Sequence, residues 1–302
     1  MIAASAVVCL GLSLASAAPL KAGDHFLELT AGGRPRSYLV HVPPGYDASR
    51  PTPLVLVFHS AMMNAPMMAR YCGLNRKADE AGFLVAYGNG TGTTPLLLYW
   101  DAGGVRGQAS DDVGYTAALL DDLATRANVD PRRVYAAGMS NGAMMCYRLA
   151  AELSGRIAAI ATVSGTMAID ECRPKRPVPV IHFHGTRDSI VPTAGADAKL
   201  IGPTRFLSLE DTVAAWLRAN GCPPVPAESS LLPDAVPADG TRVRRRAFGP
   251  GRDGSEVVLY LIENGGHTWP GADVRNKFLG LTTRDISAND LIWEFFQKHP
   301  MK

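Results

Sequence analysis

The sequence predicts an α/β fold built on a mostly parallel, doubly wound sheet with helices on both faces. Two observations carry this prediction. Strand-like and helix-like segments alternate along most of the chain, as they do in folds with parallel strands. Several strand-like segments are continuously apolar, which is typical of strands buried on both faces. Because the chain has 302 residues and is 47% hydrophobic, it can bury a large core, and we expect residues 18–302 to form a single domain.

The expected strands are marked by apolar runs or by alternating apolar and polar residues. They cover residues 36–44, 53–60, 83–89, 132–140, 157–165, 178–185, 241–248 and 255–264. The first alternates like an antiparallel strand, whereas most of the others are continuously apolar. The basic run from Arg242 to Phe248 follows a proline-rich segment, 223–239, that is expected to be an exposed loop. We interpret this run as a solvated edge strand rather than a binding patch.

The expected helices lie between these strands and have recognisable ends. They cover residues 73–82, 111–129, 142–153, 208–221 and 287–299. Gly82 and Gly221 end two of them, as glycine commonly does. Asp111 and Asp112 place negative charge at the positive end of a third helix dipole. Ser287 is the expected N-cap of the last helix.

The N-terminal residues have the pattern of a secretory signal. An apolar stretch runs from Ile2 to about Leu14, and the small residues Ala15-Ser16-Ala17 follow it. We therefore expect residues 1–17 to be a signal peptide and the protein to be secreted or periplasmic. The stretch is too short for a comfortable membrane span, so we expect no stable membrane anchor. A lipid anchor at Cys9 is disfavoured because valine precedes it, and the lack of lysine or arginine before the apolar run leaves open a start upstream of Met1.

Composition limits the partners and cofactors to be expected. The formal net charge is +2 and charged residues make up 19% of the chain, which gives no indication of a nucleic-acid partner. The sequence has no CxxC motif and no cluster of histidines and cysteines at zinc spacing, so we expect neither a metal nor another cofactor. In an exported protein the remaining cysteines can form disulfides. We favour the pair Cys172–Cys222, in loop-like surroundings, and expect Cys146 to be a free thiol in a buried helix.

The stretch VYAAGMSNGAMMCYRLA, residues 134–150, places a lone serine between a strand and a helix. This serine, Ser140, lies in Gly138-Met139-Ser140-Asn141-Gly142, which matches the G-x-S-x-G pattern of a nucleophile elbow. The glycines allow a strained turn that exposes the hydroxyl, and the helix N-terminus directs N–H groups toward developing negative charge. A serine that only caps the helix is the alternative, but the strand–turn–helix setting favours a nucleophile.

A serine hydroxyl barely ionises at neutral pH and needs a base, for which histidine is the natural residue. His267 lies on the glycine-rich stretch ENGGHTWPG, just beyond the last expected strand, where it can approach the serine. Asp188 follows the strand that ends in HFHG and is the expected orienting carboxylate. The resulting order Ser140, Asp188, His267 is the order expected of an α/β-hydrolase.

Other candidates for the base and the acid lie near the same strand ends. His182 and His184 alternate within VIHFHG, where we expect both to be satisfied in or near the core. His59 is expected to shape its loop rather than to react. Asp170 also follows a strand, and Asp197 lies further from its strand end, so both are alternative acids.

Two further groups of residues are expected around the three reactive ones. The backbone N–H of Asn141 is the expected first donor of an oxyanion hole, and the loop around Ser60 and Ala61 is expected to supply the second. The Ser60 hydroxyl is an alternative source of that second donor. Trp269, close to the candidate base, and Trp100, in LYWDAGG, are expected to line the substrate cleft and to hold an aryl or polyester chain.

These motifs resemble those of a known family. GMSNGAMMCYRLA, HFHGTRDSIVP and GGHTWPG, with GLNRKADEAGFLVAYGNGTG, DDVGYTAALLDDL and LIWEFF, are similar to the polyhydroxybutyrate depolymerase-like esterases. That family of exported α/β-hydrolases includes feruloyl-esterase-type members. The resemblance spans nearly the whole mature chain and implies Ser140 as nucleophile, Asp188 as acid and His267 as base. Ser60 stands where the family usually has glycine, a difference that leaves backbone N–H donation intact.

The expected activity is hydrolysis of carboxylic esters, small or polymeric, by two-step acyl transfer without a cofactor. The resemblance implies hydroxyalkanoate oligomers, polyesters, or aryl and feruloyl-type esters as substrates. A serine peptidase on the same fold is one alternative, although neither a lid nor a charged anchor for a peptide terminus is recognisable. A non-catalytic binding protein is the other, and the intact order of serine, aspartate and histidine disfavours it.

Overall fold

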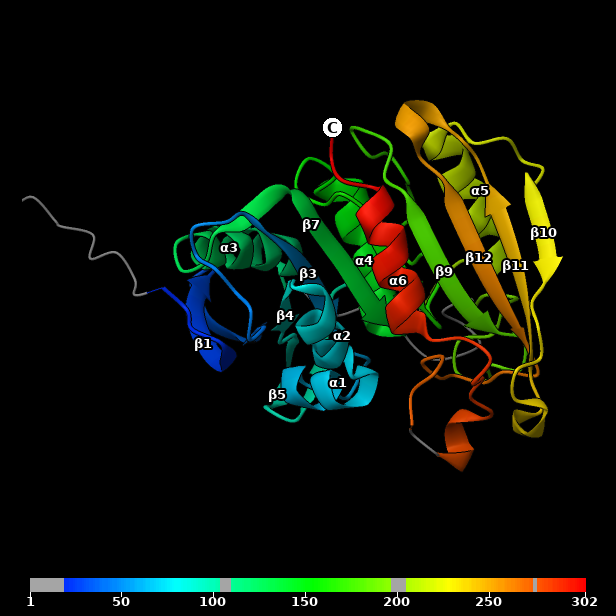
Figure 1. Cartoon of the computed structure of the whole chain (residues 1–302), viewed down its shortest axis with the longest axis horizontal. Coiled ribbons are helices and arrows are strands. Elements are labelled where there is room, and N and C mark those ends of the chain that lie inside the picture. The colour runs from blue at the N-terminus through cyan, green and yellow to red at the C-terminus, as the bar shows by residue number, and fades with distance from the viewer. Residues whose placement is uncertain (1–18, 104–109, 197–204, 274–275) are drawn as a thin grey trace, which may run out of the picture.

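The computed structural model describes residues 19–103, 110–196, 205–273 and 276–302 (Figure 1). Its strands are β1 (Gly23–Ala31), β2 (Arg34–Val42), β3 (Thr52–Phe58), β4 (Leu84–Gly88), β5 (Thr91–Thr94), β6 (Leu97–Tyr99), β7 (Val129–Met139), β8 (Ile160–Val163), β9 (Val180–Gly185), β10 (Glu228–Leu231), β11 (Arg242–Phe248) and β12 (Val257–Glu263). Its α-helices are α1 (Ala65–Cys72), α2 (Leu74–Ala81), α3 (Asp112–Ala124), α4 (Asn141–Glu152), α5 (Leu209–Asn220) and α6 (Ala288–Lys298). Short 3₁₀ helices are η1 (Pro237–Asp239), η2 (Arg252–Gly254) and η3 (Lys277–Leu279).

Within the described residues, a ten-stranded sheet in the order β1-β2-β4-β3-β7-β8-β9-β12-β11-β10 organises the molecule. The six central strands, from β4 to β12 in this order, pair in parallel, and two antiparallel strands flank them on each side. The predicted mostly parallel sheet is therefore confirmed. Because parallel strands share one direction, the carboxyl ends of the central strands all reach the same edge, where ligands bind in folds of this kind.

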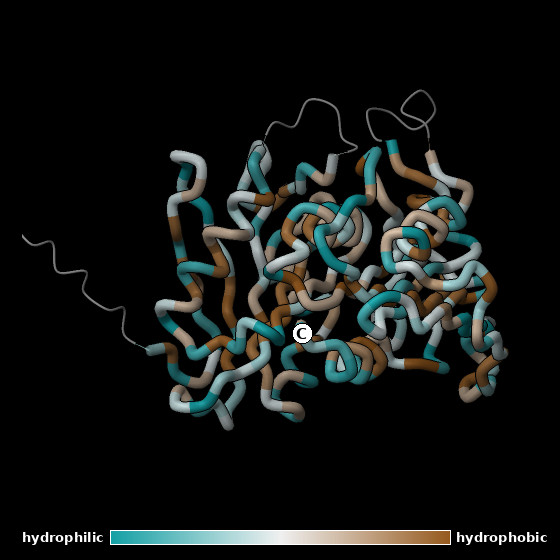
Figure 2. The backbone as a smooth tube through the Cα atoms, turned by 90° about the horizontal axis from the view of Figure 1, so that it is seen from above, coloured by the Kyte–Doolittle hydropathy of each residue, from teal (hydrophilic) through white to brown (hydrophobic). Residues whose placement is uncertain are grey.

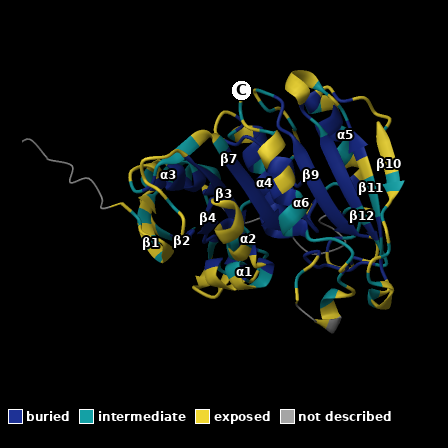
Figure 3. Ribbon diagram, viewed as in Figure 1, coloured by how far each residue is buried: buried dark blue, intermediate teal, exposed yellow. Residues whose placement is uncertain are grey.

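Both faces of the sheet are covered by helices, because successive residues of a buried strand point to opposite sides. On one side Leu54, Leu56 and Phe58 belong to a core shared with α3, α4 and α5. On the other side Val55 and Val57 belong to a core shared with α1, α2 and α6. Figure 1 shows α6 in front of the sheet and α4 behind it, and Figure 2 shows apolar segments running through the interior. The central strands are buried, whereas β1 and β10 at the two edges are largely exposed (Figure 3).

Most predicted helix ends are also present in the structure. Gly82 and Gly221 follow α2 and α5 in the left-handed conformation, with φ of 75° and 66°. The Ser287 side chain accepts a hydrogen bond from the N–H of Asp290 and so caps α6. Asp111 caps α3 in the same way, through the N–H of Gly114. These caps satisfy N–H and C=O groups that a helix end otherwise leaves unpaired.

The structure also contains elements that the sequence patterns do not predict: β1, α1, the β5–β6 hairpin and β10. Strand β10 lies inside the expected proline-rich loop and pairs with β11. The interpretation of Arg242–Phe248 as an edge strand is therefore wrong, since β10 covers that side. Two of its arginines make ion pairs, Arg244 with Glu263 at 3.2 Å and Arg245 with Glu228 at 2.5 Å.

The expected disulfide is absent, because Cys72, Cys146, Cys172 and Cys222 are all free. The Sγ of Cys222 is directed to the Ser255 carbonyl at 3.7 Å, in the core behind α5. Cys172 instead lines a hollow that is also lined by Arg218 of α5. Cys146 is a buried free thiol, as predicted, and burial raises its pKa well above the ordinary value.

The expected signal peptide at 1–17 and Cys9 lie outside the described residues. Among the helices of the described ranges, none combines the length and apolar character needed to cross a membrane.

Candidate active site

Ser140 occupies a strained turn between β7 and α4. Its backbone has φ 57° and ψ −122°, a conformation that non-glycine residues seldom adopt. The Ser140 N–H donates to the Val163 carbonyl at 2.9 Å, and its carbonyl accepts from the Met144 N–H at 3.0 Å. These two bonds tie the turn to the neighbouring strand and to the first turn of the helix.

The two glycines of the motif allow neighbouring backbone to approach closely. A Cβ at Gly142 would lie 2.1 Å from the Phe58 carbonyl oxygen, and a Cβ at Gly138 would lie 2.4 Å from the Gly142 carbonyl oxygen. Both distances are far below van der Waals contact. The G-x-S-x-G pattern is therefore explained by packing of the turn against the end of β3 as well as by the turn itself.

Asp188 and His267 are joined by a hydrogen bond between His267 Nδ1 and Asp188 Oδ2, 2.8 Å long, and both residues are buried. Asp188 lies after β9 and His267 after β12, and these strands are parallel neighbours. The loops that follow them are tied together, since the Arg187 N–H donates to the Gly265 carbonyl at 2.8 Å. The pairing of the two strands therefore brings together two residues that are far apart in the sequence.

The carboxylate of Asp188 accepts further hydrogen bonds. Its Oδ1 accepts from the N–H groups of Ile190 at 2.9 Å and Val191 at 2.8 Å. Burial opposes ionisation, but the bond from His267 and these backbone bonds hold the pKa of the Asp188 carboxyl below its ordinary value. Because an ionised carboxylate only accepts, His267 carries its proton on Nδ1, which leaves Nε2 as the basic nitrogen.

Ser140 reaches the same edge of the sheet, since β7, β8, β9 and β12 are consecutive parallel strands. Its side chain is almost fully buried, with 6% of the residue exposed, and its hydroxyl makes no hydrogen bond to another described residue. The structure thus pairs His267 with Asp188 directly and leaves the Ser140 hydroxyl unengaged at the end of β7, which β8 separates from β9.

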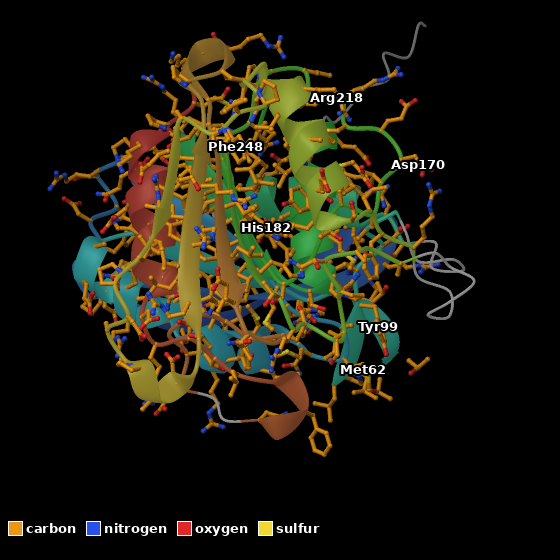
Figure 4. All side chains as sticks on the ribbon, turned by 90° about the vertical axis from the view of Figure 1, so that its right-hand side faces the viewer. Met62, Tyr99, Asp170, His182, Arg218 and Phe248 are labelled. Atoms are coloured by element: carbon orange, nitrogen blue, oxygen red, sulfur yellow. The ribbon has the colours of Figure 1, made fainter. Side chains whose placement is uncertain are left out.

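The alternative acids are placed differently. The Asp170 side chain is 75% exposed and pairs with Arg205 at 2.9 Å, at the periphery of the molecule (Figure 4). Asp197 lies outside the described residues. Of the acids that the structure describes, Asp188 alone contacts His267.

His182 and His184 are fully buried in β9 with hydrogen-bond partners, as the sequence predicts.

The loop after β3 presents backbone N–H groups near the elbow. Within the part of the chain that the structure describes, the N–H groups of Ser60, Ala61 and Asn141 donate to no acceptor. His59 is fully buried and shapes this loop, because its Nδ1 donates to the Ser60 carbonyl at 2.8 Å and its Nε2 accepts from the Gly90 N–H at 3.0 Å. Burial lowers the pKa of His59 to about 4, so this ring is neutral.

The prediction that Trp100 lines a cleft is wrong, because the residue is fully buried. Its indole N–H donates to the His59 carbonyl at 3.0 Å. Its backbone N–H donates to Asn141 Oδ1 at 2.7 Å, and its carbonyl accepts from Asn141 Nδ2 at 3.1 Å. Trp100 therefore connects the loop that carries Ser60 to the residue that follows Ser140. No pattern in the sequence marks the Asn141 side chain for this contact, because its partner is 41 residues away.

The prediction that Trp269 lines a cleft is wrong for the same reason, since this residue is also fully buried. Its indole N–H donates to Asn289 Oδ1 at 3.0 Å, and Asn289 Nδ2 donates to the Cys72 carbonyl at 2.8 Å. Trp269 anchors the loop of His267 to α6 and to the end of α1. Both tryptophans hold candidate reactive residues in place from inside the protein.

Replacing Trp100 with phenylalanine is expected to lower kcat about tenfold, since small displacements of a reactive group are costly. The free energy of unfolding is expected to fall by about 1–3 kcal/mol, because the His59 carbonyl loses its donor in a buried site. Ester turnover and denaturant unfolding measure the two effects. Trp216 is a matched control, since it is fully buried and its indole nitrogen has no partner among the described residues. An equal loss of kcat in Trp216→Phe would contradict a specific role for Trp100.

The sequence of this chain is similar to those of known esterases. A family model described as esterase PHB depolymerase matches residues 36–174. A putative esterase, NocK, from Nocardia uniformis subsp. tsuyamanensis is 36% identical over 285 residues, which cover 89% of this chain and 81% of that protein. Feruloyl esterase B from Piromyces equi is 28% identical over 77% of this chain, but the match spans only 42% of that enzyme.

Solved structures show the same fold. An acetyl xylan esterase from Aspergillus awamori superposes with a TM-score of 0.61 at 15% identity, covering 90% of this chain and 99% of that one. The fold is that of the α/β-hydrolases, and the protein is a carboxylic ester hydrolase. The chain belongs to the esterase family of the PHB depolymerase type, so the resemblance seen in its motifs is confirmed.

Proposed function

We propose that this esterase acts through a covalent acyl-enzyme, with Ser140 as nucleophile, His267 as base and Asp188 as the orienting acid. The observation that carries the proposal is the 2.8 Å bond from His267 Nδ1 to Asp188 Oδ2. It fixes the histidine tautomer that has a basic Nε2, as this chemistry requires. The strained turn at Ser140 supports the same assignment, because strained backbone is common at reactive residues.

In the proposed mechanism, His267 Nε2 takes the proton of the Ser140 hydroxyl as the oxygen attacks the ester carbonyl. The C–O bond to the leaving alcohol then breaks, and His267 returns the proton to that alcohol. Water then attacks the carbonyl of the acyl-enzyme while His267 takes its proton. The bond to the Ser140 oxygen breaks, His267 returns the proton to that oxygen, and the carboxylic acid is released. Asp188 stays ionised throughout and stabilises the imidazolium that forms in each half-reaction.

The N–H groups of Asn141 and of the Ser60–Ala61 loop are the proposed donors to the tetrahedral oxyanion. Their support is that they are unpaired among the described residues and lie at the two segments that Trp100 connects. The N-terminus of α4 adds its positive dipole end at the same place.

Exposed apolar side chains beside the site support an ester with an apolar acyl or aryl part. Met62 follows the Ser60–Ala61 loop and is 53% exposed, Ile190 follows Asp188, and Phe278 projects from the segment after His267 with 91% exposed. Figure 4 shows Met62 at the lower end of the molecule, the end where α1 and the segment after β12 lie in Figure 1. We propose feruloyl-type or other aryl esters, or hydroxyalkanoate oligomers, as the substrate class.

We further propose that residues 18–302 form one catalytic domain and that residues 1–17 direct export. The first proposal is supported by the sheet, in which every strand from β1 to β12 outside the β5–β6 hairpin takes part. The second is supported by the apolar run and the small residues that follow it.

A hydrolysis panel tests the proposed function. Aryl esters of rising acyl length, a methyl hydroxycinnamate, hydroxybutyrate oligomers and an aromatic polyester film are assayed beside a dipeptide amide. We expect turnover of the soluble aryl or hydroxycinnamate esters and none of the amide. Turnover of the amide at a rate comparable to that of the esters would favour a peptidase instead. If the folded protein hydrolyses none of the esters, the proposal is wrong.

Ser60 offers a test of the oxyanion donors. If only its backbone N–H is used, Ser60→Gly is expected to change kcat less than about tenfold, because glycine keeps that group. A hydroxyl that donates directly would make the same substitution cost on the order of 10²–10³ in kcat. Steady-state turnover of a small aryl ester decides between these outcomes, provided that thermal melting shows a folded variant.

A further inference from the structure

A chain of buried polar groups runs from Asp188 into the centre of the sheet. His184 Nε2 lies 2.8 Å from the Val191 carbonyl, and His184 Nδ1 lies 3.0 Å from His182 Nε2. At the far end, His182 Nδ1 lies 2.8 Å from the Tyr147 hydroxyl and 2.7 Å from the Thr162 hydroxyl. The residues come from β9, α4 and β8, and Figure 4 shows His182 within the sheet.

The Val191 carbonyl, at one end of this chain, can only accept a hydrogen bond, and this determines which ring nitrogens carry protons. A carbonyl oxygen cannot donate, so His184 carries its proton on Nε2 and its Nδ1 is an acceptor. His182 must then donate from its own Nε2, which leaves its Nδ1 to accept from a hydroxyl of Tyr147 or Thr162. Burial lowers the pKa of both histidines, so each ring is neutral and holds a single proton.

The chain meets the candidate acid at two points. His184 Nε2 lies 3.7 Å from Asp188 Oδ2, the oxygen that accepts from His267. Val191 is held on both sides, since its N–H donates to Asp188 Oδ1 at 2.8 Å while its carbonyl accepts from His184. His184 therefore closes the loop whose N–H groups hold the carboxylate.

We propose that His184 is a positioning residue that holds Asp188 on His267, and that His182 keeps the His184 proton on Nε2 for that purpose. The inference rests on the proposed function, because it assigns His184 a task only if Asp188 orients the base. A histidine that merely filled the core would need neither a shared loop with Asp188 nor a defined tautomer. The titratable groups that face His184 are His182 on its own strand, Asp188, and His267 from the loop after β12.

The tautomers are tested first, by long-range proton–nitrogen NMR of the histidine rings in the wild-type protein. We expect both His182 and His184 to be neutral Nε2–H tautomers from pH 6 to pH 8. An Nδ1–H tautomer or a charged ring at either position would overturn the proposal. This measurement needs no variant, so it holds even if a substitution at His184 fails to fold.

Kinetics of two substitutions provide the second test. His184→Gln keeps an N–H donor close to the position of Nε2, whereas His184→Leu has none. We expect kcat to fall on the order of 10²-fold in His184→Leu, with KM nearly unchanged, and His184→Gln to recover most of that loss. The acid limb of kcat/KM, which reports protonation of the free base, is expected to move to lower pH in His184→Leu, because a displaced Asp188 stabilises the imidazolium less.

A matched control separates positioning from loss of stability. Phe183 is the fully buried residue between the two histidines, and it packs on the opposite face of β9 against Tyr260. Phe183→Leu is expected to lower the melting temperature without moving the acid limb. An unmoved limb in His184→Leu, or equal kcat in the Leu and Gln variants, would overturn the inference.

Ser140→Ala is assayed on the same substrate so that the two proposals fail separately. If Ser140→Ala stays active, the proposed function is wrong. If Ser140→Ala is inactive and His184→Leu behaves like the wild type, only the inference is wrong.

Discussion

Replacing Ser140 with alanine is expected to lower ester turnover by about 10⁶-fold, the loss found when a triad nucleophile is removed. Without the hydroxyl there is no acyl-enzyme, and the remaining donors can only assist attack by water. The turn is expected to survive, because its hydrogen bonds to Val163 and Met144 use only the Ser140 backbone. Turnover of an aryl ester and a thermal melt measure both expectations.

Ser164 provides a matched control for this substitution. It is a buried serine that follows the neighbouring strand β8, and it also has a positive φ, 50°. Ser164→Ala is expected to keep turnover within about tenfold of the wild type and to be labelled by a serine-directed phosphonate, whereas Ser140→Ala is expected to escape labelling. Labelling of Ser140→Ala at the wild-type rate would assign the nucleophile to another residue.

The central part of the fold could be predicted because its strands are buried on both faces. Strand β3 is buried at every position, and so its sequence is apolar throughout. Helices α2 and α5 could be bounded because Gly82 and Gly221 mark their ends. The edge strands β1 and β10 were not predicted, because exposed positions place polar residues in them and weaken the pattern.

The common edge of the candidate reactive residues could be predicted for a related reason. Parallel strands deliver their following loops to one edge, so a serine, an aspartate and a histidine after three such strands are expected to be close. The environment of Trp100 and Trp269 could not be predicted in this way. Whether a tryptophan faces solvent depends on partners that are distant in sequence, such as Asn141 for Trp100. The unpaired Cys172 and Cys222 illustrate the same limit, because loop-like surroundings do not determine the direction of a side chain.

Replacing Asp188 with asparagine is expected to lower kcat by about 10⁴-fold, the effect of the same change in a serine triad. Asparagine keeps the size of the side chain, but its amide can donate to His267 and so favours the tautomer with the proton on Nε2. That tautomer cannot accept the serine proton. The measurement is kcat on an aryl ester, determined at a series of pH values that extends into the alkaline range.

Asp170→Asn is the matched control, because Asp170 also follows a strand but is exposed and paired with Arg205. It is expected to leave kcat unchanged within about twofold, since breaking an exposed ion pair has little effect even on stability. Near-normal turnover in Asp188→Asn with collapse in Asp170→Asn would transfer the orienting role to Asp170. The hydrogen bond from His267 to Asp188 makes the opposite result the expected one, because only a carboxylate in contact with the imidazole can fix its tautomer.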